Sequence, residues 1–441
     1  MSIGTTSYAT FLEAKRKSAK PLGVDIARTD VHPLLHDWQA EIVQWACHIG
    51  RAAVWADTGL GKTLMQIEWV RIMAGDGLGL IVAPLAVCHQ TVKEAARVGV
   101  DLTYVRSGDG LTSGLFITNY EMLDHFDPTV VRAVVLDEAS ILKSSDGKTR
   151  KRLISHFAET PYRLACTATP APNDVEELTN QAEFLGVTTR VNMLAAYFVH
   201  DSDAGWRLKG HAKGPMYRWM ASWAVALRRP SDMGYPDDGY QLPGLEILPH
   251  LLPVDIVPDD QLFATELGGV GGRAKIRRQT LDVRVARVAE IVAAEPDEPW
   301  VLWCGLNDEA DALARLIPGS VNVPGTWTVE QKAEALNDFA DGRLRVLIIK
   351  PQIAAFGLNW QHCARMAFVG LNDSYEAYYQ AIRRCYRYGQ TRVVHAHVVL
   401  SDLEGQIAVN VARKEREASG VMAALVSEMH AARETSRSIN V

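Results

Sequence analysis

Residues 56–63 of this 441-residue chain, Ala-Asp-Thr-Gly-Leu-Gly-Lys-Thr, constrain its fold more than any other segment. They follow a short apolar run and precede residues 64–72, which have a helical pattern. A glycine-rich turn between a strand and a helix directs backbone N–H groups at a phosphate chain. Lys62 adds a positive charge for the β- and γ-phosphates, and Thr63 adds a hydroxyl for Mg²⁺. The segment therefore predicts a nucleotide-binding α/β domain, although Ala56 stands where the GxxxxGK[ST] pattern has its first glycine.

Short apolar runs of the strand type recur through both halves of the chain. They are residues 52–55, 79–83, 102–105, 115–118, 134–137 and 164–167, and then 301–304, 346–349, 366–369 and 394–400. Helical stretches separate several of these runs. Such alternation predicts parallel sheets covered by helices on both faces. We therefore expect an α/β protein with two parallel-sheet domains.

A proline-rich segment separates the two halves. Five prolines, Pro230, Pro236, Pro243, Pro249 and Pro253, exclude a long helix or a central strand there. The expected organisation is an N-terminal extension at residues 1–29, a first domain at 30–229, a linker at 230–272, and a second domain at 273–441 that ends in a helical tail. The first domain is expected to carry a helical projection near residues 186–229.

Two acidic residues, Asp137 and Glu138, stand at the carboxyl end of the apolar run 134–137. Ligands of open α/β sheets gather at this end of the strands. Asp137 is predicted to hold Mg²⁺, and Glu138 is predicted to polarise the water that attacks the γ-phosphate.

The phosphate-binding segment and the Asp-Glu-Ala-Ser sequence at residues 137–140 together resemble the superfamily 2 helicases and translocases. Residues 36–39 look like the glutamine motif of that family, in which Gln39 would read adenine. The ATP-binding residues that the resemblance implies are Gln39, Thr58, Gly59, Leu60, Gly61, Lys62 and Thr63. Thr63 and Asp137 would hold the metal.

Two further segments in the first half match the Swi/Snf-like branch of this family. Residues 137–144 resemble its DEAHxxKN sequence, with Ser140 in place of histidine and Ser144 in place of asparagine. Residues 167–173 resemble motif III, with Ala168 and Pro172 as departures from the usual TGTPxxN.

Other segments resemble the DNA-facing loops of the family. Residues 82–85 are similar to motif Ia, residues 117–123 to the ITxYE motif, and residues 354–359 to motif V with alanines for both leading glycines. The DNA-binding residues implied by these matches are Pro84, Asn119, Tyr120 and Asn359.

Residues 380–390 are close to QAxxRxxRxGQ, the Swi/Snf-like form of motif VI. Guanidinium groups that reach ATP from the second domain would stabilise the charge of the transition state. By position in the motif, Arg384 and Arg387 have this catalytic role, together with Gln380 at its start.

The resemblance covers roughly residues 30–400 and implies two RecA-like domains with an ATP cleft between them. It implies a DNA-dependent ATPase that uses ATP and Mg²⁺ to move along double-stranded DNA. Two alternatives stay open: a helicase that separates strands at forks or branched DNA, and an ATP-dependent clamp that recruits a nuclease or a methyltransferase. The length of the chain favours a compact prokaryotic or phage form.

The net charge of −6 opposes nucleic-acid binding, so DNA would have to meet a local basic surface. The six cysteines are scattered without a CxxC pair, which predicts neither structural zinc nor a disulfide framework. Apolar runs are too short to span a bilayer. These features favour a cytoplasmic protein in a reducing compartment.

Two segments admit two interpretations each. Trp219 and Trp223 are four residues apart, which favours core packing on one helix face and leaves a DNA-contacting projection as the alternative. The basic residues Arg273, Lys275, Arg277 and Arg278 are read as a solvated helix start or as a phosphate-contacting patch.

Overall fold

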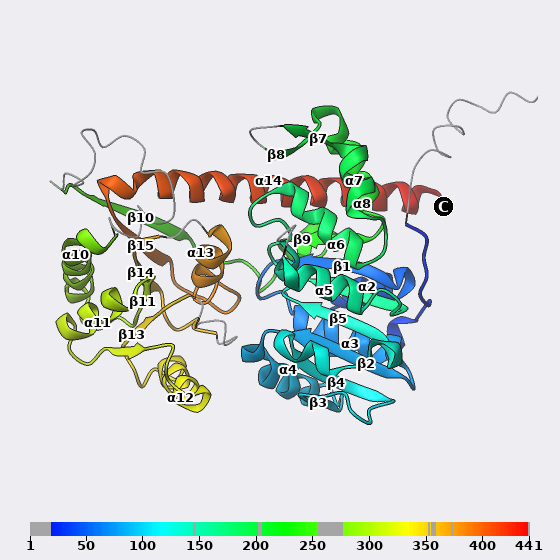
Figure 1. Cartoon of the computed structure of the whole chain (residues 1–441), viewed down its shortest axis with the longest axis horizontal. Coiled ribbons are helices and arrows are strands. Elements are labelled where there is room, and N and C mark those ends of the chain that lie inside the picture. Colours follow the sequence, from blue (N-terminus) through cyan, green and yellow to red (C-terminus); the bar gives the residue numbers. More distant parts are fainter. Residues whose placement is uncertain are drawn as a thin grey trace, which may run out of the picture. The chain divides into compact units, whose positions relative to one another are not determined.

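The computed structural model describes residues 19–143, 147–201, 205–254, 277–351, 353, 359–371 and 374–439. The chain forms two compact units, the first comprising Met1–Asp237 with Glu417–Val441 and the second Asp238–Arg416 (Figure 1). The motif V residues 354–358, Ser144, Arg273, Lys275, and residues 255–272 of the expected linker lie outside the described residues.

Within the described residues, the first unit contains a seven-stranded sheet in the order β3-β4-β2-β5-β6-β1-β9. Its strands are β1 Arg51–Ala56, β2 Leu78–Ala83, β3 Leu102–Tyr104, β4 Gly114–Asn119, β5 Val131–Asp137, β6 Tyr162–Cys166 and β9 Ala224–Leu227. Every pairing in this sheet is parallel. All six residues of β2 are buried, as expected for a strand covered on both faces.

The helices of the first unit follow its strands in the expected alternation. They are α2 Asp37–Ile49, α3 Lys62–Ala74, α4 Leu85–Arg97, α5 Lys148–His156, α6 Leu178–Phe184, α7 Arg190–Tyr197 and α8 Lys213–Met220. A separate antiparallel hairpin, β7 Phe198–Asp201 with β8 Gly205–Leu208, lies between α7 and α8 in the chain. Trp223 is fully buried against Trp55, so core packing is the correct interpretation for this residue.

The described part of the second unit contains a six-stranded sheet in the order β10-β15-β14-β11-β13-β12, again with parallel pairings. Its strands are β10 Leu245–Leu252, β11 Trp300–Cys304, β12 Val321–Val323, β13 Val346–Ile349, β14 Arg365–Val369 and β15 Val394–Ser401. Its helices are α10 Leu281–Ala294, α11 Asn307–Leu316, α12 Val329–Ala340, α13 Tyr375–Ile382 and the start of α14 Gly405–Ile439. The two parallel sheets confirm the predicted fold class.

Strand β10 falls within the residues expected to form the linker. It lies at the edge of the second sheet and pairs only with β15 among the described strands, with Pro249 opposite Val398. A proline is tolerated there because an edge strand pairs with a neighbour on one side only. On its other side, no backbone N–H is needed for hydrogen bonds between strands. The proline pattern therefore excluded a central strand correctly but did not reveal an edge strand.

Neither interpretation of Arg277 is correct, because this residue belongs to a buried ionic network in the second unit. Arg277 lies 3.0 Å from Glu309, and Arg284 lies 2.8 Å from the same carboxylate oxygen. Glu404 completes the network 3.5 Å from Arg284. Arg284 and Glu309 are both fully buried, and buried charges persist only when they are paired in this way.

The C-terminal part of α14 packs on the first unit. Val421, Met422, Leu425 and Val426 join the hydrophobic core of that unit. An ion pair of 3.3 Å between Arg218 and Glu428 lies beside this contact. The part of α14 from Glu417 onward therefore belongs to the first unit.

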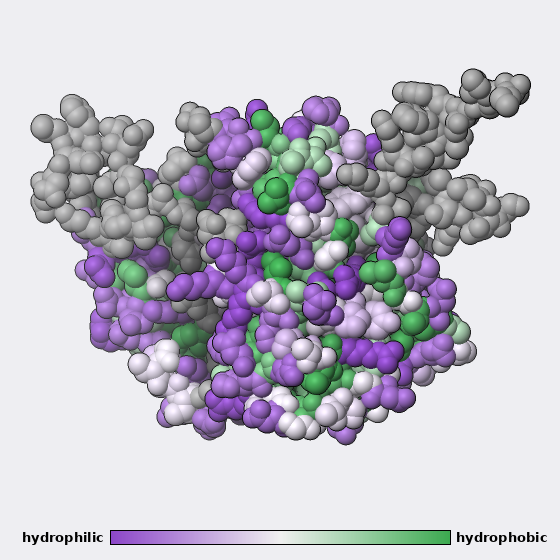
Figure 2. All heavy atoms as spheres, turned by 45° about the vertical axis from the view of Figure 1, so that its right-hand side comes forward, coloured by the Kyte–Doolittle hydropathy of each residue, from purple (hydrophilic) through white to green (hydrophobic). Residues whose placement is uncertain are grey.

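The surface is predominantly polar in the view of Figure 2, where hydrophobic residues are scattered among hydrophilic ones. Across the ranges that the structure describes, we find no helix with the length and apolar character needed to span a bilayer.

Candidate ATP site and nucleic-acid interface

The predicted strand–loop–helix order of the phosphate-binding segment is observed. Strand β1 ends at Ala56 and helix α3 begins at Lys62. Gly59 and Gly61 have φ angles of 85° and 72°, in the left-handed region that favours glycine. Because Gly61 caps α3, the first N–H groups of the helix have no partner within the helix and can donate to an anion.

The side chain of Lys62 lies over its own loop. Its Nζ atom donates to the carbonyl oxygens of Ala56 at 2.8 Å and Asp57 at 3.2 Å. These two contacts hold the positive charge at the concave side of the turn, where a phosphate chain would meet it.

Gln39 is built into the phosphate-binding loop. It is 3% exposed, and its Nε2 atom donates to the carbonyl of Leu60 at 3.0 Å. Its Oε1 atom accepts from the backbone N–H of His36 at 2.9 Å. A Cβ atom at Gly61 would lie 2.3 Å from Gln39 Nε2, and the φ angle of 72° is one that other residues rarely adopt, so a substitution there would be strained. The structure thus connects the glutamine motif to the loop, and adenine recognition by Gln39 stays a prediction.

Replacing Gln39 by alanine is expected to raise the KM for ATP and to lower the free energy of unfolding by about 1–2 kcal/mol, since two buried hydrogen bonds are lost. Steady-state ATPase assays and urea unfolding measure the two effects. Gln44→Ala is the matched control, because Gln44 lies on the same helix and donates to Ile26 at 3.1 Å rather than to the loop. An unchanged KM in Gln39→Ala would contradict a role at the nucleotide.

Asp137 lies at the end of β5, close to the start of α3. Gln66, one turn after Thr63 on that helix, donates from Nε2 to Asp137 Oδ1 at 2.8 Å. Burial raises the pKa of Asp137, while the hydrogen bond from Gln66 and the charge of Lys62 act in the opposite direction. A carboxylate and a hydroxyl are oxygen ligands, which Mg²⁺ prefers. Thr63 and Asp137 would therefore hold the metal.

Glu138 has an unusual backbone conformation. Its φ angle is 54°, and no other non-glycine residue of the described structure has a positive φ. Such a conformation costs on the order of 1–3 kcal/mol, and strained residues of this kind cluster at functional sites. The carboxylate accepts from Thr167 Oγ1 at 3.5 Å, and the N–H of Thr169 donates to the same hydroxyl at 3.1 Å. The strained backbone thus holds the Glu138 carboxylate against the motif III segment.

Gln181 is a connecting residue that the sequence did not reveal. Its Oε1 atom accepts from Trp55 Nε1 at 2.8 Å, and its Nε2 atom donates to the carbonyl of Pro170 at 2.9 Å. Trp55 immediately precedes the phosphate-binding segment, and Pro170 belongs to the motif III segment. Gln181 therefore links the two through buried hydrogen bonds, but no short pattern marks its position on α6.

The residues predicted to face DNA in the first unit differ in exposure. Pro84 is partly exposed and caps α4. Asn119 and Tyr120 are 4% and 6% exposed. Asn119 accepts from Tyr104 at 2.9 Å, and the Tyr120 hydroxyl donates to the carbonyl of Asp137. The structure places both side chains inside the unit, where Tyr120 supports the end of β5.

Motif VI begins on α13 and continues into a turn. Gln380 lies in the last turn of the helix, and Arg384 and Arg387 follow it. Gln390 fixes the turn, because its Nε2 atom donates to the carbonyls of Cys363 at 3.0 Å and Cys385 at 3.3 Å. The final glutamine of the motif thus has a structural role in this unit.

Arg387 is a desolvated cation. Burial, followed by the charges of Arg384 and Arg383, lowers the pKa of Arg387 to about 10. Its Nε atom is buried without a hydrogen-bond partner, and Arg387 forms no ion pair with another residue that the structure describes. Arg383, in contrast, lies 5.1 Å and 5.3 Å from the ring centres of two tyrosines, Tyr379 and Tyr386. An uncompensated guanidinium favours an anion, so the structure is compatible with a phosphate-contacting role for Arg387.

Asn359 is the described residue of the motif V segment. Its Oδ1 atom is buried and has no hydrogen-bond partner. The contact with DNA predicted for Asn359 stays a prediction.

Each of the two units contains residues that match a known protein domain family. Residues 32–193 match the SNF2-related domain, and residues 286–389 match the helicase conserved C-terminal domain. The chain is 25% identical over 215 residues to the chromodomain-helicase-DNA-binding protein 3 homolog of Caenorhabditis elegans. This match covers 38% of the chain and 12% of that longer relative.

A solved structure described as the Sulfolobus solfataricus SWI2/SNF2 ATPase core in complex with dsDNA is similar to the chain, with 18% identity and a TM-score of 0.42. The similarity covers 90% of this chain and 96% of that one.

A phosphate-binding loop, an acid pair at a strand end and an arginine motif, carried by two parallel-sheet units, are features of the two-domain, RecA-like class of P-loop proteins. Together with the matched SNF2-related and helicase C-terminal domains, they show that the chain belongs to the Swi/Snf-like branch of superfamily 2.

Proposed function

We propose that this protein is a DNA-dependent ATPase that uses ATP hydrolysis to move along double-stranded DNA. The buried Nε atom of Arg387, which has no hydrogen-bond partner, is the observation that carries the proposal, because an arginine finger acts when its guanidinium meets the γ-phosphate. The matches of residues 32–193 to the SNF2-related domain and of residues 286–389 to the helicase conserved C-terminal domain also support the proposal.

The first unit would bind ATP and prepare the attacking water. The N–H groups at the start of α3 and the Lys62 ammonium would hold the phosphates. Glu138 would orient the water and accept its proton. Mg²⁺ held by Thr63 and Asp137 would neutralise part of the phosphate charge.

The second unit would complete the site in a closed state. Arg384 and Arg387 would then stabilise the charge that develops on the γ-phosphate. In this proposal, bound DNA favours the closed state, so that hydrolysis depends on DNA. Repeated closure and opening would advance the two units along the duplex.

Comparison of nucleic acids tests the proposed substrate. ATPase rates measured with duplex DNA, single-stranded DNA and RNA should be highest with the duplex. A rate that is high without any nucleic acid, or highest with RNA, would contradict the proposal. Slow hydrolysis at saturating DNA would instead favour the ATP-dependent clamp.

One observation favours the strand-separating alternative. The β7–β8 hairpin is not part of the seven-stranded sheet, and it lies at the margin of the first unit (Figure 1). It carries His200 and Trp206 as a cross-strand pair, with ring centres 4.9 Å apart. An aromatic hairpin could stack on an unpaired base. A strand-displacement assay distinguishes this activity from movement along an intact duplex.

The affinity for DNA should fall steeply with salt, despite the net charge of −6. Contacts with backbone phosphates release counterions, which gives a log–log slope of about −0.9 for each phosphate neutralised on duplex DNA. Fluorescence anisotropy with a labelled duplex at increasing potassium acetate measures the slope. A flat response would contradict backbone tracking and would indicate a protein or small-molecule substrate.

A further inference from the structure

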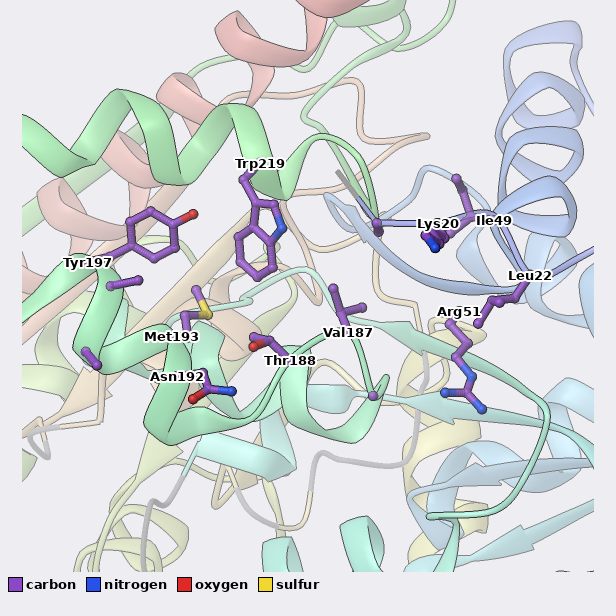
Figure 3. A pocket seen from close by; sticks show the side chains of 14 residues that line it. Lys20, Leu22, Ile49, Arg51, Val187, Thr188, Asn192, Met193, Tyr197 and Trp219 are labelled. Atoms are coloured by element: carbon purple, nitrogen blue, oxygen red, sulfur yellow. The ribbon is translucent and has the colours of Figure 1, made fainter. Parts of the chain in front are cut away.

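The first unit contains a cavity that is separate from the candidate ATP site. It has a volume of about 900 Å³ and is lined by the segment at residues 19–22, the start of β1, residues 186–188, α7 and Trp219 (Figure 3). Arg51 of this cavity begins β1, whereas Ala56 ends it beside the phosphate-binding loop. The two residues are about 17 Å apart, because a strand rises about 3.3 Å per residue. A ligand here would leave the ATP site open.

One side of the cavity is apolar and aromatic. Figure 3 shows Tyr197, Met193, Val187 and Trp219 grouped on this side. The rings of Tyr197 and Trp219 are stacked, with centres 5.8 Å apart and planes 29° apart. Met193, which also lines the cavity, is buried. This side can contact the flat or aliphatic body of a ligand.

The other side of the cavity is cationic. Lys20 and Arg51 lie there, and none of the described residues that line the cavity is acidic (Figure 3). The Nε atom of Arg51 donates to the carbonyl of Pro161 at 2.9 Å, and Arg51 forms no ion pair with a residue in the described ranges. The charge of Glu159 acts on Arg51 from a greater distance, so among the described residues no carboxylate contacts the guanidinium directly.

A second arginine increases the positive charge behind this side. Arg163 is the Cα partner of Arg51 in the neighbouring strand β6. It is 3% exposed and donates to the backbone carbonyls of Thr160 and Phe184 at 2.9 Å and 2.7 Å. Like charges on paired strands repel each other, so an anion near them would be stabilising.

We propose that this cavity binds a small organic anion whose carboxylate or sulfonate pairs with Arg51 and Lys20 and whose aromatic body contacts Tyr197 and Trp219. The cavity volume lies within the range of about 300–1,000 Å³ that small-molecule sites have. A guanidinium and a carboxylate form paired, charge-assisted hydrogen bonds, which would fix the orientation of the ligand. The site does not depend on the function proposed above.

Anilinonaphthalene sulfonate is a suitable probe, because it combines a sulfonate with an aromatic body. It is titrated into the full-length protein in saturating ADP and Mg²⁺, and its fluorescence is recorded. We expect one saturable site, and a Kd about tenfold higher in Arg51→Gln, since a charge-assisted hydrogen bond is lost. Arg97→Gln should bind like the wild type, because Arg97 pairs with Glu94 outside the cavity.

A second variant examines the aromatic side. Trp219→Leu should also weaken binding of the probe, while Arg51→Lys should bind the probe more tightly than Arg51→Gln because the charge is kept although the paired hydrogen bonds are lost. Thermal unfolding confirms that each variant is folded. The absence of a saturable site in the wild type, or equal affinities for the wild type and Arg51→Gln, would overturn the proposal.

Discussion

Replacement of Glu138 by glutamine is expected to lower the ATP turnover rate by a factor of about 10²–10⁴ while ATP affinity is retained, because an amide cannot accept the proton of the attacking water. The amide has almost the same shape as the carboxylate, so the backbone at φ 54° and the contact with Thr167 should persist. Single-turnover hydrolysis measures the first quantity, and binding of a fluorescent ATP analogue measures the second.

Lys62→Ala provides the comparison for this experiment. Among the described residues, its ammonium group donates to the loop carbonyls of Ala56 and Asp57, so its removal should leave the core intact and should lower both affinity and turnover. If Glu138→Gln instead lowered affinity and left turnover essentially unchanged, Glu138 would not be the base.

The second large effect is expected for Arg387→Ala. Loss of this guanidinium should reduce the DNA-stimulated ATPase rate by a factor on the order of 10³, the lower end of the contribution that arginine fingers make. ATP binding should be retained, because Gln39, Lys62 and Thr63 belong to the first unit. ATPase rates at saturating DNA and nucleotide binding without DNA measure the two outcomes.

Arg383→Ala is the internal control for Arg387. The Arg383 guanidinium lies against the rings of Tyr379 and Tyr386, whereas Arg387 has a buried Nε atom without a partner. The control should therefore have a much smaller effect on the stimulated rate. Equal losses in the two variants would show that the register assigned to motif VI is wrong.

Local chemistry explains why the fold and the phosphate-binding loop could be predicted from the sequence. A buried parallel strand needs a continuous apolar run, and the loop needs glycine where φ is positive, as at Gly59 and Gly61. Both requirements act on neighbouring residues and leave a visible pattern. Asp137 and Glu138 at the end of β5 could be predicted for the same reason, because they directly follow an apolar run.

Burial was the property that the motifs did not reveal. Asn119 and Tyr120 lie in a segment that resembles a DNA-facing loop, yet their side chains form hydrogen bonds inside the first unit. Arg277 stands in a basic run but is paired with Glu309, 32 residues later in the chain. Gln181 bridges Trp55 and Pro170 across the interior. Contacts of this kind depend on tertiary structure, and no local spacing indicates them.

We propose that ATP hydrolysis moves the protein along intact double-stranded DNA. Displacement of a third strand from a DNA triplex tests it most directly, because a moving protein removes that strand without opening the duplex beneath it. We predict ATP-dependent triplex displacement by the wild type and its loss in Glu138→Gln, with no separation of the duplex strands. Separation of the duplex strands, or no displacement while ATP is hydrolysed at full rate, would contradict movement along intact duplex DNA.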